Sequence, residues 1–225
     1  MIVIEGADGS GKATQSRLLL RRLRREGVRA ERIAFPQYGK SFFGELAAAY
    51  LRGEFGPSDR VDPRLAALLY AGDRWEAAEW LLGRLRAGVT VVCDRYVDSN
   101  KAHQGARLPR GADLGAFLDW LDRLEYRVLR LPRADFTIFL HVPPATAERL
   151  ISRKGRRAYL RGRRRDIHEA DRTHLRRAEA IYLRLARQRP AGRGCMIRCV
   201  ERGKLLSKSA VRDQVWSAVR KEVEN

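Results

Sequence analysis

The sequence predicts an α/β fold, in which a five-stranded parallel sheet carries helices on both of its faces. Short apolar runs alternate with longer amphipathic stretches along the chain, which is the pattern of parallel strands and their covering helices. The chain has 225 residues, of which 44% are hydrophobic, and this suffices for one sizeable core. No internal repeat and no low-complexity linker interrupts it. We therefore expect a single domain over residues 1–225.

Local signals justify the elements in turn. Apolar runs bounded by turn residues predict strands at residues 2–5, 30–35, 90–94, 136–142 and 195–200. Amphipathic periodicity predicts helices at residues 13–26, 42–52, 63–87, 114–124, 145–153, 171–188 and 207–223. Helix boundaries carry capping signals, because Asp62 precedes Pro63, Asp171 precedes an apolar stripe, and Gly27 and Gly88 follow two helix ends.

Charge and cysteine content restrict the environment and the partners. The formal net charge is +19, with 46 Lys and Arg against 27 Asp and Glu, which favours an anionic partner. Arginine greatly outnumbers lysine, however, and a GC-rich genome produces such a skew without any binding role, so both explanations stay open. Three cysteines cannot all pair, which favours reduced thiols in the cytoplasm. No run approaches the roughly 18 apolar residues of a membrane helix, and no secretion signal is evident, so we expect no membrane partner.

The stretch "IEGADGSGKATQ" predicts a loop that binds phosphate. Its glycines and lysine satisfy the pattern G-x-x-x-x-G-K between a predicted strand and a predicted helix. The glycines let backbone N–H groups turn toward phosphates, the helix N-terminus adds its positive dipole end, and the lysine can bridge the β and γ oxygens of ATP. The fold expected is then the three-layer P-loop NTPase fold. The residues assigned to the ATP phosphates are Gly6, Ala7, Asp8, Gly9, Ser10, Gly11, Lys12, Ala13 and Thr14.

One position of this loop lacks the usual chemistry. Ala13 stands where a hydroxyl ordinarily contacts Mg²⁺. Thr14 lies about 100° further round the helix, where it is aimed at the α-phosphate. Carboxylates are the obvious substitutes, because Mg²⁺ takes few protein ligands and keeps several waters. We therefore predict that Asp8 and Asp94 hold Mg²⁺, directly or through water.

Six segments of the chain match a known family in order and in separation. They are "EGADGSGKATQ", "FPQY", "YAGDR", "CDRYVDSNKAHQGA", "DFTIFLHVPP" and "RRAYLRGRRRDIHEAD". From residue 2 to about residue 187, the chain resembles the thymidylate kinase (dTMP kinase) family of P-loop nucleoside monophosphate kinases. The resemblance implies transfer of the γ-phosphoryl group of ATP to dTMP, Mg²⁺ as cofactor, a homodimer, and a basic lid over approximately residues 153–168. The chain departs from the family at Ala13 and at His141, where an aspartate is expected, and these departures concern the metal geometry.

The resemblance also assigns residues to the acceptor nucleotide. It implies that Phe35 stacks on the pyrimidine and that Arg74 hydrogen-bonds a thymine carbonyl. Taken alone, Phe35 would be a core side chain at a strand end, and Arg74 would be an exposed helical arginine. Asp94 and Arg95 follow a buried strand, at the sheet edge where ligands gather. The resemblance implies that Arg95 clamps the acceptor phosphate with its planar guanidinium. The predicted dTMP-binding residues are Asp8, Phe35, Pro36, Tyr38, Arg74, Arg95, Ser99, Asn100, His103 and Gln104.

The amides of Asn100 and Gln104 can donate and accept at once, which suits a pyrimidine edge. A role for Ser99 or His103 is open, and a solvent-facing helical position explains His103 equally well. The segment 153–165 holds eight basic residues out of thirteen, and their repulsion disfavours a packed element until anions arrive. In the family this segment is the lid; a solvated charge run or a nucleic-acid patch is the alternative. The predicted catalytic residues are Lys12, Asp94, Arg95, Arg153, Arg157 and Arg161.

Behind the basic segment, Asp166 and Glu169 are explained as negative charges at the start of the next helix. Three functions are compatible with the sequence. The first is ATP-dependent phosphorylation of dTMP, and this is the one we expect. The second is a related kinase for another pyrimidine nucleotide or a nucleoside, but an arginine beside Asp94 suits a phosphate acceptor better than a hydroxyl. The third is a non-catalytic, arginine-rich protein that binds nucleic acid, which is disfavoured because the basic segment contains only Tyr159 as an aromatic residue.

Overall fold

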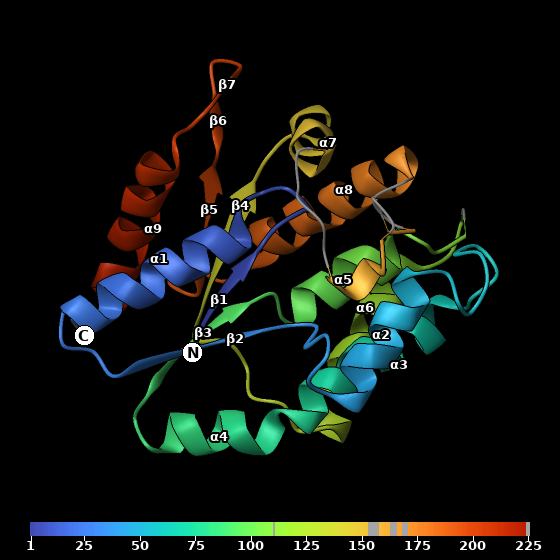
Figure 1. Cartoon of the computed structure of the whole chain (residues 1–225), viewed down its shortest axis with the longest axis horizontal. Coiled ribbons are helices and arrows are strands. Elements are labelled where there is room, and N and C mark those ends of the chain that lie inside the picture. Colours follow the sequence, from blue (N-terminus) through green and yellow to red (C-terminus); the bar gives the residue numbers. More distant parts are fainter. Residues whose placement is uncertain (110, 153–157, 163–165, 168–170, 224–225) are drawn as a thin grey trace.

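The computed structural model of the chain describes residues 1–109, 111–152, 158–162, 166–167 and 171–223. Its centre is a sheet with the strand order β2-β3-β1-β4-β5, in which all neighbours are parallel (Figure 1). The five predicted strands are confirmed with small changes at their ends. Their bounds are β1 (Ile2–Glu5), β2 (Ala30–Ala34), β3 (Thr90–Asp94), β4 (Phe136–His141) and β5 (Gly194–Arg198).

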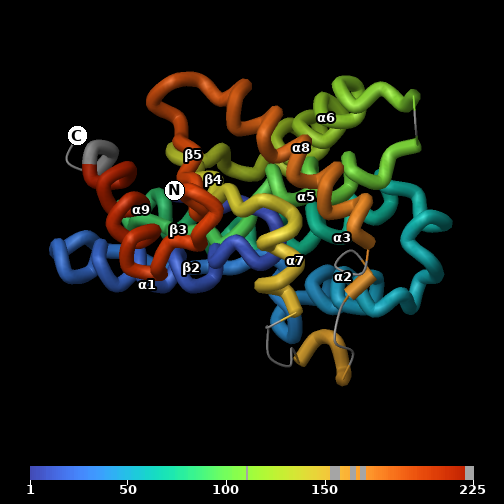
Figure 2. Tube along the Cα trace, turned by 90° about the horizontal axis from the view of Figure 1, so that it is seen from above, coloured from blue at the N-terminus to red at the C-terminus, as the bar shows by residue number. Residues whose placement is uncertain are grey.

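Helices cover both faces of this sheet, as predicted. On one face, Ile2 and Ile4 pack in a core cluster with Leu19 and Leu23 of α1 (Lys12–Arg25) and with α9 (Lys208–Val223). On the other face, Val3 packs toward α4 (Ala78–Arg86) and the start of α5 (Val97–Gly105), while α8 (Arg172–Gln188) packs against α5. The two views agree that α1 lies beside α9 and that α5 lies beside α8 (Figures 1 and 2). Because strand side chains alternate in direction, Glu5 faces the same side as Val3.

The remaining elements build the end of the molecule at the carboxyl edge of the sheet and beyond it. The predicted caps are confirmed, since Asp62 Oδ1 accepts from the N–H of Arg64 at 2.7 Å and Asp171 Oδ1 accepts from the N–H of Thr173 at 2.8 Å. None of the helices in the described residues is long and apolar enough to cross a membrane. The further bounds are α2 (Phe42–Leu51), α3 (Pro63–Glu76), α6 (Leu114–Asp122), the π-helix η1 (Arg123–Val128), α7 (Pro144–Ser152), the 3₁₀-helix η2 (Ala158–Leu160) and the hairpin β6 (Val200–Glu201) with β7 (Lys204–Leu205).

Three predicted elements have different bounds in the structure, and one helix was missed. The helix expected at residues 63–87 is broken at Ala77, which packs in the core beside Leu81. The helical pattern of the sequence continues through this point, so it is tertiary packing that breaks the helix. The helix expected at 114–124 continues as η1, and the strand expected at 195–200 gives way to the hairpin. The helix α5 was not predicted. Its residues "VDSNKAHQG" lack an apolar stripe because several of them line a cleft.

Candidate active site

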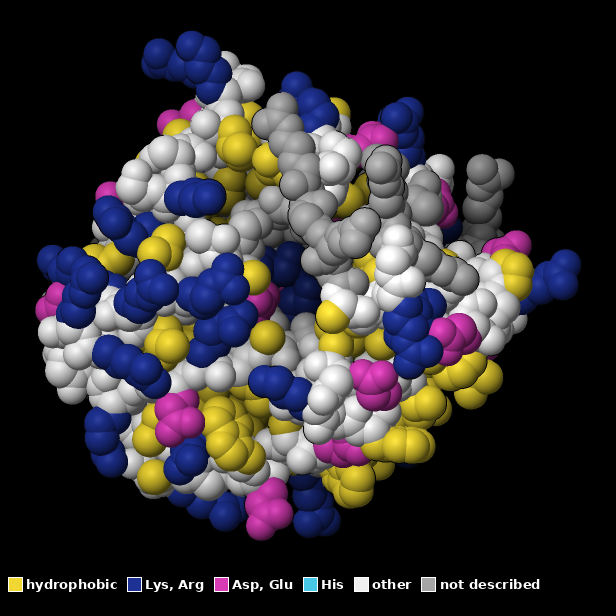
Figure 3. Space-filling model, viewed as in Figure 1, with side chains coloured by type: hydrophobic (Ala, Val, Ile, Leu, Met, Phe, Trp, Pro, Cys, Tyr) yellow, Lys and Arg dark blue, Asp and Glu magenta, His cyan; other side chains and the backbone are white. Residues whose placement is uncertain are grey.

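A cleft of about 760 Å³ opens where β1, β2 and β3 end, which is the edge at which parallel sheets bind ligands. Figure 3 shows a hollow in this face with Lys and Arg side chains in its depth. The cleft brings together most of the predicted site residues. Those lining it are Asp8, Gly9, Gly11, Lys12, Ala13, Thr14, Phe35, Pro36, Tyr38, Arg74, Asp94, Arg95, Ser99, Asn100, His103 and Gln104.

The phosphate loop packs against the chain beneath it and leaves no room for side chains at two positions. Gly6 has φ 146°, and an added Cβ would lie 2.5 Å from the carbonyl oxygen of Leu140. At Gly9, with φ 83°, an added Cβ would lie 2.9 Å from the carbonyl oxygen of Ala147. Only glycine tolerates both conditions. Gly6, Ala7 and Ser10 do not line the cleft, whereas Asp8, Gly9, Gly11, Lys12, Ala13 and Thr14 do.

Lys12 begins α1 and is only 6% exposed. Its Nζ donates to the carbonyl oxygen of Ala7 at 2.8 Å, which folds the side chain back over the loop. This places the ammonium group inside the cradle that the loop forms. A phosphate that enters the cleft therefore meets a preorganised positive charge.

Arg95 leaves β3 in the left-handed region with φ 69°, a conformation that costs energy for a residue other than glycine. Its guanidinium crosses to the phosphate loop, where Nη2 donates to Asp8 Oδ1 at 2.5 Å. The other terminal nitrogen, Nη1, donates to Ser99 Oγ at 3.1 Å and lies 3.4 Å from His103 Nε2. Burial, reinforced by the positive charge of Arg95, lowers the pKa of His103 well below its usual value, so His103 is neutral at physiological pH.

Glu5 lies directly behind these residues, although nothing in the sequence marked it. One carboxylate oxygen accepts from the backbone N–H of Tyr96 at 2.7 Å and of Ser99 at 3.1 Å, and the other accepts from Ser99 Oγ at 2.6 Å. Burial raises the pKa of Glu5, and the charge of nearby Asp98 adds to the rise. Glu5 thus anchors the first turn of α5 to the strand that precedes the phosphate loop.

Asp94 is held by Arg32, which is the second residue after Glu5 whose role the sequence did not indicate. Arg32 on β2 donates from Nη2 to Asp94 Oδ2 at 2.7 Å and from Nε to Ser16 Oγ at 2.7 Å. The other carboxylate oxygen of Asp94 accepts no hydrogen bond from the part of the chain that the structure describes. Asp94 therefore lines the cleft with one oxygen fixed and one available. In the sequence, the only indication of this role was the position of Arg32 near the end of a predicted strand. The structure shows that this strand neighbours β3.

Arg74 is not the exposed helical arginine that its sequence context favoured. It is 2% exposed, and its Nε donates to Glu125 Oε2 at 2.8 Å while Nη2 donates to Glu125 Oε1. Asn100 joins the same carboxylate, with Nδ2 3.0 Å from Glu125 Oε1. Gln104 accepts at Oε1 from Arg107 Nη1 at 2.9 Å. Arg74 of α3 and Asn100 and Gln104 of α5 thus line the cleft, and Glu125 of η1 and Arg107 hold them from behind.

Phe35 is both a core residue and a wall of the cleft. It is 4% exposed, its ring centroid lies 5.9 Å from that of Tyr96, and it precedes Pro36 through a cis peptide bond. The following loop is fixed by Asp73, a buried carboxylate whose Oδ2 accepts from the N–H of Gln37 at 3.0 Å. Burial raises the pKa of Asp73, while its hydrogen bonds with Ser41 and Gln37 oppose that rise.

The basic segment is described only in part. Arg153, Arg157 and Glu169 lie outside the described residues; Arg161 is exposed and does not line the cleft. The ring of Tyr159 stacks on Tyr38 with centroids 4.1 Å apart. Asp166 is not the helix cap that was expected, because Asp171 caps α8. Asp166 is instead buried, lines the cleft and accepts from the hydroxyl of Tyr159 at 3.3 Å.

Metal ligands and surface charge complete the description of the site. No group of three His, Cys, Asp or Glu suited to a metal occurs among the residues that the structure describes. His141, which stands where the family resemblance leads one to expect aspartate, lies with Nε2 2.9 Å from Glu179 Oε1.

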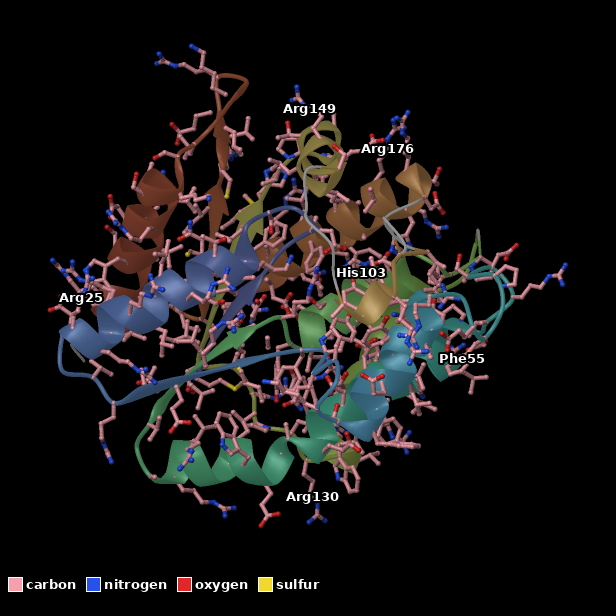
Figure 4. The ribbon with its side chains drawn as sticks, in the orientation of Figure 1. Arg25, Phe55, His103, Arg130, Arg149 and Arg176 are labelled. Atoms are coloured by element: carbon pink, nitrogen blue, oxygen red, sulfur yellow. The ribbon has the colours of Figure 1, made fainter. Side chains whose placement is uncertain are left out.

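Figure 4 labels His103 in the middle of the molecule, whereas the labelled arginines lie at the periphery and point outward. These four arginines do not line the cleft.

Comparisons with known proteins identify the family and support the fold. A sequence model of the family described as thymidylate kinase matches residues 4–198. A thymidylate kinase of Mycobacterium tuberculosis is 38% identical over 199 residues, which cover 88% of this chain and 90% of that protein. The human thymidylate kinase is 36% identical over 147 residues, covering 65% of this chain and 63% of that protein. A solved structure of a Candida albicans thymidylate kinase has a TM-score of 0.73 at 22% identity, covering 98% of this chain and 91% of that one, and it supports the fold. The chain belongs to the thymidylate kinase family.

Proposed function

We propose that this cleft transfers the γ-phosphoryl group of ATP to dTMP and yields dTDP. One observation carries the proposal: a phosphate loop and a base pocket line one cleft, and Arg95 lies between them. Phosphoryl transfer needs little covalent help from the protein. Catalysis rests on positioning the two nucleotides and on stabilising the charge that develops between them.

The donor side is the loop between β1 and α1. Its backbone N–H groups and Lys12 receive the ATP phosphates, with the N-terminus of α1 behind them. The acceptor side begins one strand away, because Ile4 of β1 pairs with Asp94 of β3 and neighbouring strands lie about 4.8 Å apart. The ion pair between Asp8 and Arg95 joins the two sides. Arg95 is thus held where a planar, charged fork can bind the acceptor phosphate close to the donor.

The base pocket has a polar pattern that fits thymine. Gln104 is left with its Nε2 donor, because Oε1 is taken by Arg107. Asn100 is left with its Oδ1 acceptor, and Arg74 keeps Nη1, for which the described residues offer no hydrogen-bond partner. Thymine presents two carbonyl acceptors on either side of the N3–H donor. The pocket and the base are therefore complementary in kind, and the ring of Phe35 supplies an apolar surface for stacking.

We expect dTMP to be the best acceptor in a panel of nucleoside monophosphates. The 5-methyl group of thymine separates dTMP from dUMP by about 1–3 kcal/mol at most, so dUMP should be a poorer substrate that is still used. A coupled assay of ADP release gives kcat/KM for dTMP, dUMP, dCMP, dAMP and dGMP. Equal values for purine and pyrimidine monophosphates would contradict the proposal.

Mg²⁺ fits the side chains of the cleft as a cofactor held by two carboxylates. Asp94 offers the oxygen that Arg32 does not engage, and Asp8 lies on the phosphate loop at the same cleft. Two carboxylates suit this ion, which commonly takes one or two of them together with phosphate oxygens and water. When bound, it neutralises charge on the β and γ oxygens of ATP. Ala13 contributes no oxygen, so the protein relies on Asp8 and Asp94 more heavily than a loop with a hydroxyl would.

Ala13→Ser should therefore lower the Mg²⁺ concentration needed for half-maximal activity, by up to about tenfold. Ala13 is exposed in the first turn of α1, where serine costs only a few tenths of a kcal/mol. Binding of Mn²⁺, followed by electron paramagnetic resonance, gives a second readout without turnover. Asp94→Asn should change both quantities in the opposite direction.

Ala145→Ser is the matched control, because Ala145 is exposed at the second position of α7 and does not line the cleft. It should leave the metal requirement unchanged. An unchanged titration in Ala13→Ser together with a fully active Asp94→Asn would place the ion on other groups.

The enzyme acts as a homodimer, and the surface of α3 is the part of the chain that fits this role. Leu65, Leu68 and Trp75 lie on one side of α3 and are 62%, 41% and 54% exposed, and Phe42 at the start of α2 is 69% exposed. Figure 3 shows hydrophobic side chains gathered over this region. Monomeric proteins rarely leave such a contiguous apolar patch in water. The three cysteines are free thiols, which suits a cytoplasmic enzyme.

Light scattering during size-exclusion chromatography should give twice the mass of one chain. The double variant Leu65→Glu/Trp75→Glu should give one chain, because it places charges in the apolar contact. Leu205→Glu, on the distant hairpin β6–β7, is the control and should remain dimeric. A wild-type chain that elutes as a monomer at micromolar concentration would contradict the proposal.

A further inference from the structure

The amide of Asn100 has only one chemically sensible orientation. Asn100 is 2% exposed, and its Nδ2 donates to the carbonyl oxygen of Ala67 at 3.0 Å and to Glu125 Oε1 at 3.0 Å. Both partners are acceptors, so a reversed amide would set oxygen against two oxygens. Oδ1 is buried and accepts no hydrogen bond from any described residue. Asn100 lines the cleft, where a bound ligand or a water molecule can supply the missing donor.

Glu125 is the residue that joins this amide to Arg74. It is fully buried at 0% exposure and lies on the π-helix η1, an irregular turn that is frequent at functional sites. Its carboxylate accepts from two nitrogens of Arg74, on α3, and from Asn100, on α5. These hydrogen bonds fix the plane of the Arg74 guanidinium. Arg74 lines the cleft, and its third nitrogen, Nη1, is not engaged by Glu125.

We propose that Glu125 determines the base specificity of the acceptor pocket, because it holds Asn100 with an acceptor and Arg74 with a donor toward the base. This inference rests on the proposed pyrimidine acceptor. Thymine and uracil offer the N3–H donor beside the O4 acceptor, and they match this pair. Cytosine offers an N3 lone pair beside an amino donor. Its N3 acceptor therefore faces the acceptor of Asn100, and its amino donor faces the donor of Arg74. Glu125 thereby excludes dCMP without touching the nucleotide, which makes it a positioning residue.

Glu125→Gln separates this role from a merely structural one. The new carboxamide has the same size, but it carries an NH₂ group in place of one acceptor oxygen, so it cannot accept from both Arg74 and Asn100 as the carboxylate does. Both side chains then lose the orientation that the carboxylate imposes on them. We expect kcat/KM for dTMP to fall more than kcat/KM for dCMP, so that their ratio falls by about 10–100-fold. A loosened fold would lower both values together, and the ratio does not depend on the fraction of active protein.

Two further variants complete the experiment. Glu125→Asp keeps the negative charge but withdraws the carboxylate by one methylene group from Arg74 and Asn100, and it should lower the ratio even where the Gln variant does not fold. Asp122→Asn is the matched control, because Asp122 lies one turn earlier, pairs with Lys101 at 2.8 Å and does not line the cleft. Its ratio should equal that of the wild type. A wild-type ratio retained in both Glu125 variants would overturn the inference, whereas a wild-type chain without preference for dTMP over dCMP would overturn the proposed function itself.

Discussion

Replacement of Lys12 by methionine lowers kcat for dTMP phosphorylation by about 10²–10³-fold, the effect expected when one preorganised charge stabiliser is removed. The ammonium group lies at the phosphate loop, 2.8 Å from the carbonyl oxygen of Ala7, and Lys12 lines the cleft. Methionine has nearly the same length and fits the buried position. The loss should appear in kcat more than in KM for dTMP, because the charge acts on the transition state.

Lys101→Met is the control for this substitution. Lys101 is also buried, but it pairs with Asp122 and does not line the cleft, so the variant should keep a kcat within a few-fold of the wild type. Thermal unfolding of both variants verifies that the fold persists. Turnover of Lys12→Met at a rate close to that of the wild type would remove the phosphate loop from the mechanism.

Replacement of Arg95 by methionine has the second-largest expected effect, with kcat/KM for dTMP falling by roughly 10²–10³-fold. Truncating one partner of a buried, hydrogen-bonded charge pair costs about 2–5 kcal/mol, and each 1.36 kcal/mol is a factor of ten. Arg95 bonds to Asp8 and to Ser99, so the loss also releases the two sides of the cleft from each other. KM for dTMP should rise strongly, while KM for ATP should change little.

Arg95→Lys distinguishes charge from geometry. Lysine keeps the positive charge but lacks the planar fork that reaches Asp8 and an acceptor phosphate together. The variant should therefore recover only part of the activity. A rise in KM for ATP alone, with KM for dTMP unchanged, would assign Arg95 to the donor.

Those parts of the fold that depend on neighbouring residues could be predicted from the sequence. Asp62 and Asp171 cap helices because a carboxylate two or three residues ahead of free N–H groups forms the bond wherever the chain folds. The phosphate loop is equally local. The break at Ala77 was not predictable in this way, because no glycine or proline marks it and only packing in the core requires it.

The site was predictable where it followed strand ends and unpredictable where it relied on distant partners. Asp94 and Arg95 follow directly from the end of a buried strand. Arg74 seemed exposed because its partner, Glu125, is 51 residues further along the chain and was placed beyond the end of a predicted helix. Glu125 carries no local signal of function, and Arg32 offers only its position near the end of a strand. Each acquires its role from one hydrogen-bonded carboxylate or amide that only the folded chain brings near.

The donor side of the cleft is one short contiguous loop, whereas the acceptor side is a wall assembled from separate helices. Donor binding and acceptor specificity can therefore change separately in evolution. Changes on α3, α5 or η1 can alter which base is accepted without disturbing the strand and loop that hold the donor. Conversely, Gly6 and Gly9 admit no side chain, so these two positions of the donor loop have almost no freedom to vary. Substrate range in such an enzyme should therefore drift through residues like Glu125, and a redesign toward a new acceptor should begin at the helices and leave the loop unchanged.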